Sequence, residues 1–201
     1  MPNIIFPFNE VKTSAVAEAI LRRLGGKTNY MYLLKLVYFA DRYHLRKDLR
    51  PATSDRYFAM KRGAVASYLY DVCKGDRYSD IFVPLENYQV ALRNDTDRYE
   101  DELSNSDIES IKFSLSNFAE FGEFNLSIIT HAYPEWKKYE GVIISGKSRS
   151  EEMNFVDFLE NADPDDPIFR RYGLRDPYPP ISEEEKELMK DELFEISSQF
   201  V

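Results

Sequence analysis

The segment from residue 28 to residue 47 constrains the fold most, because apolar residues occupy nearly every face of the helix it would form. Residues 31–40 read Met-Tyr-Leu-Leu-Lys-Leu-Val-Tyr-Phe-Ala, with Thr28 as the expected N-cap and Pro51 just beyond the end. A helix that is apolar nearly all round is normally covered on several sides. We therefore expect a central helix around which the rest of the chain packs.

Apolar stripes at helical spacing predict further helices over residues 11–24, 104–122 and 182–200, and Ser67 is expected to cap a shorter one. Alternation over residues 88–93 is typical of a half-buried strand. These patterns predict a mainly α fold with a small β element, formed by a single compact helical domain and a C-terminal helical extension. We place the domain at residues 1–140 and the acidic extension at residues 141–201.

Two acidic stretches are expected to be exposed. Residues 94–102 read as a solvated loop, and the proline-containing turns at 163–167 and 176–180 are expected to frame an exposed connection. Apolar runs in the 201-residue chain stay far below the roughly 20 residues of a membrane span, and the N-terminus lacks the pattern of a signal peptide. Together with a single cysteine, this favours a cytoplasmic protein.

Charge is unevenly distributed along the chain, whose formal net charge is -9. Residues 1–75 carry 13 Lys and Arg against 6 Asp and Glu, whereas residues 76–201 carry 13 against 29. The two halves could form a polarised surface that steers a charged partner, or could neutralise each other within the fold. A nucleic-acid-binding regulator using the basic half, with Arg42, Arg46 and Arg62 as phosphate contacts, is the alternative function.

Catalytic patterns are weak. The Gly-Gly-Lys-Thr sequence at residues 25–28 lacks the earlier glycine of a phosphate-binding loop, and Cys73 lies at the end of a predicted helix, where nothing lowers its pKa. Asp41 and His44, with distant His131, could form a metal or hydrolase site, but hydrogen bonds to neighbouring tyrosines explain them more simply. We assign no catalytic, cofactor or metal residues, and two histidines and one cysteine exclude a four-ligand Cys/His zinc site.

Four separated motifs resemble the Panacea domain of SocA-like proteins, and the likeness extends over roughly residues 12–140. The first three motifs follow the family patterns K-L-x-Y-x-A-[DE], G-D-x-[YF]-x-A-x-x-x-G-P-V and L-S-x-x-[DE], and the last is T-H-x-x-x-x-W. They are carried by Lys35, Leu36, Tyr38, Ala40 and Asp41, by Asp55, Tyr57, Ala59, Gly63 and Val65, by Leu103, Ser104 and Asp107, and by Thr130, His131 and Trp136. Ser54 departs from the pattern, which usually has glycine before the aspartate, and Ala64 and Ala66 stand where proline is common.

The resemblance implies a bacterial or phage-associated antitoxin that binds and neutralises a cognate toxin encoded by a neighbouring gene. It implies no enzyme activity, no cofactor and no membrane partner, and nucleic acid is not the expected ligand. Two mechanisms stay open: occlusion of the toxin, or its delivery to a protease, with a chaperone as a further possible partner.

Charged and aromatic residues of these motifs are expected to form a scaffold. An unpaired buried ion costs several kcal/mol, so charges beside large apolar neighbours have to pair or to cap backbone groups. The expected scaffold residues are Lys35, Tyr38, Asp41, Asp55, Tyr57, Lys61, Gly63, Tyr70, His131 and Trp136. Candidate partner contacts lie on one stripe of the terminal helix, which could equally be buried within the monomer. They are Met189, Leu193, Ile196 and Phe200.

Overall fold

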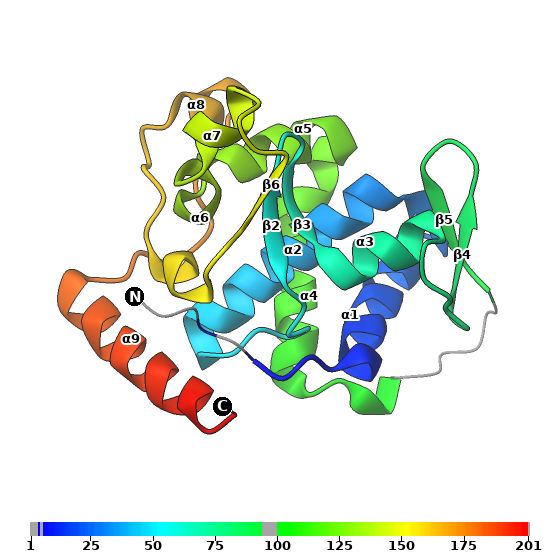
Figure 1. Cartoon of the computed structure of the whole chain (residues 1–201), viewed down its shortest axis with the longest axis horizontal. Helices are drawn as coiled ribbons and strands as arrows, with labels where there is room; N and C mark the ends of the chain where they lie inside the picture. Colours follow the sequence, from blue (N-terminus) through cyan, green and yellow to red (C-terminus); the bar gives the residue numbers. More distant parts are fainter. Residues whose placement is uncertain (1–3, 5, 94–99, 201) are drawn as a thin grey trace.

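Helix α2 (Tyr30–Asp48) runs through the centre of the molecule in a computed structural model that describes residue 4, residues 6–93 and residues 100–200 (Figure 1). Thirteen of its residues are buried, among them Leu33, Val37 and Phe39, which are fully covered. Helices α1 (Glu10–Arg23), α4 (Asn105–Phe118) and α5 (Gly122–Ile129) pack against it. The predicted central helix is therefore confirmed.

Small antiparallel sheets flank these helices, so the chain is mainly helical with a small β element, as the periodicity predicted. One sheet has the order β1-β5-β4 and the other β3-β2-β6. The strands are β1 (Lys27–Asn29), β2 (Tyr57–Met60), β3 (Gly63–Ala66), β4 (Phe82–Leu85), β5 (Gln89–Leu92) and β6 (Ser150–Glu152). The remaining helices are α3 (Ser67–Lys74), α6 (Pro134–Lys137), α7 (Glu140–Ile144), α8 (Pro167–Tyr172) and α9 (Glu183–Ser198), with the 3-10 turns η1 (Glu100–Glu102), η2 (Ala119–Phe121), η3 (Thr130–Ala132) and η4 (Phe155–Leu159).

Helix starts depart from the sequence prediction at two places. Thr28 lies in β1, and the side chain of Asn29 caps α2 by accepting from the Met31 N–H at 2.8 Å. Ser67 is the first residue of α3 rather than its cap. The Asp55 carboxylate, distant in sequence, accepts from the first N–H groups of that helix instead. Two other starts agree with the local sequence signals: Ser104 forms a capping box with Asp107 at α4, and the Ser182 hydroxyl accepts from the Glu185 N–H at α9.

The segment after residue 140 contributes to the same core as the helices before it. Strand β6 pairs with β2, and Phe158 is fully buried. Tyr178 lies within the second of the two proline turns that predicted an exposed connection, yet it is buried and donates its hydroxyl hydrogen to the carbonyl of Phe39 at 2.9 Å. That prediction is wrong at this position, because the turns bring an aromatic ring back onto α2. The division into two units at residue 140 stays a prediction.

Ion pairs join the basic first part of the chain to the acidic remainder. Lys12 pairs with Asp107, Lys47 with Glu109, and Arg56 with Glu152. Much of the charge asymmetry is thus neutralised within the fold. Residues 94–99, most of the predicted solvated loop, lie outside the described residues, and the next three residues form η1. In the part of the chain that is described, no helix combines the length and apolarity that crossing a bilayer requires.

Candidate functional site

Three motif residues hold the hairpin formed by β2 and β3 against the helices. The buried ammonium of Lys35 donates to the carbonyl of Ala64 at 2.5 Å, and the Trp136 indole N–H donates to the carbonyl of Met60 at 3.0 Å. Gly63 has a φ of +91°, and a Cβ there would lie 2.0 Å from the Thr130 hydroxyl oxygen. Glycine is therefore required both by the backbone conformation and by the closeness of η3.

His131 completes this contact by stacking on Trp136, with ring centroids 3.6 Å apart. Burial, and secondly the Lys35 ammonium, lower the pKa of His131 to about 4. Burial alone lowers the pKa of Lys35 to about 7. Within the described residues, the Nε2 atom of His131 has no hydrogen-bond partner. The ring is therefore neutral at ordinary pH and acts as a packing surface beneath the hairpin.

A second motif cluster surrounds Asp41 inside the core. Its carboxylate accepts from the Thr53 N–H at 2.9 Å, from the Thr53 hydroxyl, and from the Tyr57 hydroxyl at 2.8 Å. Burial raises the pKa of Asp41 despite these donors. His44 is also fully buried, with its ring nitrogens near the Arg50 carbonyl and the Ser106 hydroxyl. Both residues tie loops to α2.

Asp55 fixes the start of α3. Its two carboxylate oxygens accept from the N–H groups of Tyr68 and Leu69, each at 3.0 Å. Burial raises the pKa of Asp55 to about 6, while these backbone donors act in the opposite direction. This is an N-terminal cap supplied from a distant loop.

An interior ion pair that the sequence analysis missed lies next to Tyr38. The Arg42 guanidinium contacts both carboxylate oxygens of Glu135 at 3.0 Å, and the Tyr38 hydroxyl donates to the same carboxylate. Arg42 lies between the rings of Tyr133 and Tyr178, 4.6 and 4.9 Å from their centroids. Although burial lowers the pKa of Arg42, the Glu135 carboxylate raises it above its ordinary value. No sequence signal pairs these residues, since 93 positions separate them in the chain.

Most expected scaffold residues are therefore bonded to one another or to the backbone, but Lys61 and Tyr70 differ. Lys61 is exposed at the hairpin turn, where no ion pair to a described residue is formed, so it does not take part in a buried network. Tyr70 is partly exposed and packs its ring against Tyr30, with centroids 6.0 Å apart. Lys61 was expected to pair because a buried charge requires a partner. Its ammonium is exposed to water instead, so it requires none.

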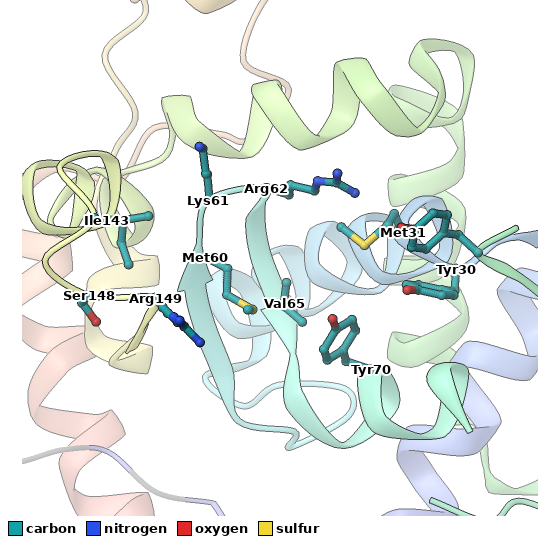
Figure 2. A pocket seen from close by; sticks show the side chains of 12 residues that line it. Tyr30, Met31, Met60, Lys61, Arg62, Val65, Tyr70, Ile143, Ser148 and Arg149 are labelled. Atoms are coloured by element: carbon teal, nitrogen blue, oxygen red, sulfur yellow. The ribbon is translucent and has the colours of Figure 1, made fainter. Parts of the chain in front are cut away.

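Lys61 and Tyr70 line a pocket of about 590 Å³ at the outer face of the hairpin (Figure 2). Its walls come from the start of α2, from the hairpin, from α3 and from the loop after α7. In Figure 2 the side chain of Arg62 extends toward Met31, while Arg149 faces the pocket from the opposite side. The lining residues are Tyr30, Met31, Met60, Lys61, Arg62, Val65, Tyr70, Tyr88, Ile143, Gly146, Ser148 and Arg149.

A second pocket of about 380 Å³ adjoins the first and shares Met31, Lys61, Arg62 and Tyr88 with it. Phe124, which is 78% exposed, lies on its wall. We call the two pockets together the hairpin surface. Sequence reasoning did not identify it, because its residues come from six separate segments of the chain.

The terminal stripe proposed for partner contacts is mostly used within the chain. Leu193 is fully buried, and Met189 and Ile196 pack against the core from α9. Only Phe200 keeps a large exposed fraction, 53%. The intramolecular alternative therefore holds for the first three residues.

Alternative activities find little geometry to support them. Asp41 and His44 are buried and line none of the pockets described, whereas His131 lies on the wall of the smaller pocket, so no pocket joins the three. Among the described residues, no cluster of three or more His, Cys, Asp or Glu side chains could hold a metal ion. Burial raises the pKa of the Cys73 thiol well above its ordinary value. For the nucleic-acid alternative, Arg42 and Arg46 are engaged in the interior and only Arg62 is free to meet phosphate.

Comparison with known proteins gives one match. A family model described as "Antitoxin SocA-like, Panacea domain" matches residues 33–137, more than half of the chain. Neither the curated proteins nor the solved structures include a significant match. The matched region extends from α2 to α6 and contains the hairpin, both motif clusters and Trp136. The chain therefore belongs to the family of SocA-like antitoxins that carry the Panacea domain.

Proposed function

We propose that this chain is a cytoplasmic antitoxin that binds a cognate toxin protein, encoded by a neighbouring gene, and keeps it inactive without catalysing a reaction. The family match over residues 33–137 carries this proposal. A non-catalytic role is supported by the motif side chains, since Lys35, Asp41 and Asp55 are buried and bonded to backbone or neighbouring side chains. Residues used in this way stabilise a fold and are not free to react with a substrate.

Coexpression tests the proposal. The neighbouring gene is induced alone and together with this chain, and growth is followed. We expect growth arrest with the neighbouring product alone, recovery with both, and a complex that purifies intact. Arrest that persists at equal expression, with no complex on affinity purification, would contradict the function.

Stoichiometry separates binding from catalysis. At a fixed concentration of purified toxin, added antitoxin should reduce toxin activity linearly, with full inhibition near one equivalent. An enzyme would silence an excess of toxin at a small fraction of an equivalent, and that result would overturn the non-enzymatic assignment.

Occlusion is the mechanism we propose, because the hairpin is fixed by Gly63, Lys35 and Trp136 and presents a preformed surface. Under occlusion, immunoblots show an unchanged toxin level when the antitoxin is present. A fall in toxin level that disappears in protease-deficient cells would instead establish delivery to a protease.

A further inference from the structure

Three cations of the hairpin surface lack partners among the described residues and line the same pocket. Lys61, Arg62 and Arg149 are exposed and form no ion pair or side-chain hydrogen bond with any described residue. In contrast, Arg56 at the other end of β2 forms a two-point ion pair with Glu152. Acidic residues outnumber basic residues by 35 to 26 in this chain, so shortage of carboxylates does not explain the unpaired cations.

Among the residues that the structure describes, no acidic side chain lines the larger pocket, and Glu123 is the one acid on the wall of the smaller pocket. Three cations that face a shared hollow repel one another and raise the local positive potential. An anionic partner that enters this hollow therefore gains attraction without first displacing an internal carboxylate. Charge complementarity thus favours an acidic occupant.

Apolar and aromatic side chains form the floor between these cations. Tyr30, Tyr70 and Met60 line the larger pocket, and Met31 lies beneath Arg62 at the boundary of the two pockets (Figure 2). Aromatic anchors surrounded by charged side chains are the chemistry of binding hot spots between proteins. Methionine adapts its shape to a partner at little cost. The floor therefore suits bulky apolar side chains of a bound polypeptide.

Tyr88 is held at this surface in an unusual backbone conformation. Its φ is +61°, in the left-handed region, and its carbonyl accepts from the Tyr30 N–H at 2.8 Å. The ring packs edge-on against Tyr30 and keeps 58% of its surface exposed. The preceding residue, Asn87, also has a positive φ, +58°, so the two residues form the tight turn between β4 and β5, and this turn fixes Tyr88 at the wall of both pockets.

We propose that the hairpin surface is where the toxin docks, and that the toxin presents there a segment with acidic side chains beside at least one bulky apolar side chain. This inference rests on the proposed function. Beyond that function, it identifies the surface that binds the toxin and the chemistry of the toxin segment that docks there. Nucleic acid is a poorer occupant, because only a few cations are available in a chain of net charge -9 and the floor is apolar.

Matched charge reversals test the inference. The variant Lys61→Glu with Arg62→Glu alters the hairpin surface. The control Lys112→Glu with Arg175→Glu changes the same residue types at exposed positions that line neither pocket. All four side chains lack described ion pairs, so the two variants should unfold at the same urea concentration as the wild type.

We expect the hairpin variant to bind the purified toxin at least about 30-fold more weakly and to lose growth rescue, while the control behaves as wild type. Toxin binding by the wild type should also weaken with added salt more steeply than binding by the hairpin variant. Equal affinity of both variants for the toxin would overturn the docking surface while leaving the antitoxin function intact.

Failure of the wild-type chain to bind or neutralise the toxin would contradict the proposed function itself, so the two failures are distinguishable. A mobility-shift assay with a random-sequence DNA duplex at low salt tests whether the hairpin surface binds nucleic acid instead of a protein. Binding of DNA that is lost in the hairpin variant, with toxin binding unchanged, would also overturn the inference.

Discussion

Arg42 and Arg62 belong to the same basic part of the chain, yet their surroundings are opposite. Arg42 is fully buried, pairs with Glu135 and donates to the Phe158 carbonyl at 2.7 Å. Arg62 is exposed on a hairpin turn and meets no described acid. The interior region therefore uses charge to fix helices and loops, whereas the hairpin surface keeps its charge available. The difference indicates which region stabilises the fold and which can bind a partner.

Removing the charge of Glu135 should give the largest effect on stability. The variant Glu135→Gln leaves the Arg42 cation buried without a counter-ion, so the free energy of unfolding should fall by about 3–5 kcal/mol in urea titrations. The control Glu109→Gln disrupts the exposed pair with Lys47, which water screens, and should change the free energy of unfolding far less. Equal losses in the two variants would show that the interior pair is not special.

Gly63→Ala tests how firmly the hairpin is held. The new methyl group would lie 2.0 Å from the Thr130 hydroxyl and 2.8 Å from the Ser127 carbonyl oxygen, so the hairpin or η3 must shift. We expect a loss of about 3 kcal/mol by thermal or urea unfolding. Gly173→Ala is the control, since its φ is also positive but nothing lies within 4 Å; it should cost only about 1 kcal/mol. A loss at Gly63 no greater than at Gly173 would contradict the close approach.

The buried Lys35 predicts a pH dependence of stability. Its pKa is about 7 in the folded chain and 10.5 ordinarily, so between these values the unfolded state binds more protons. The free energy of unfolding should therefore rise with pH through this window. Below pH 7 the charged Lys35 is buried in the folded chain, so the cost of burying its charge is present in full. The variant Lys35→Met lacks this titration. Relative to wild type, its unfolding free energy should be highest near neutral pH and decline toward about pH 9. Parallel curves for the two proteins would contradict the lowered pKa.

The smallest expected effect is at Ser54, whose φ of +57° lies in the left-handed region that favours glycine. Glycine adopts this conformation without a Cβ clash but loses more entropy on folding. We expect Ser54→Gly to stabilise the chain by about 0.5–1 kcal/mol, measured as a higher Tm with toxin binding unchanged. A lower Tm would show that the serine side chain makes a contribution greater than the strain.

Sequence patterns predicted the long helices because each buries a continuous apolar stripe, and the Ser104 capping box marked the start of α4. Short elements were missed: α8 and β6 contain too few residues to show a period, and they form because they pack on other parts of the chain. At α3 the neighbouring Ser67 is the local capping signal, but Asp55 reaches the first N–H groups of the helix from the loop before β2.

Motif matching identified most of the interior scaffold, but it did not show which residues contact one another. Glu135 and Arg42 are separated by 93 positions, and their pairing follows only from the fold. The hairpin surface was missed for a similar reason, because Arg62 and Arg149 are brought together by the loop after α7. Long-range proximity of this kind is not encoded in periodicity or local spacing.

Hydrogen exchange on the complex with the toxin tests the central claim most directly, because it reports which backbone amides become protected on binding. The account predicts new protection in residues 60–65 and 143–149, with exchange in α9 and around Arg42 unchanged. Protection confined to residues 183–198, with the hairpin exchanging as in the free chain, would contradict it.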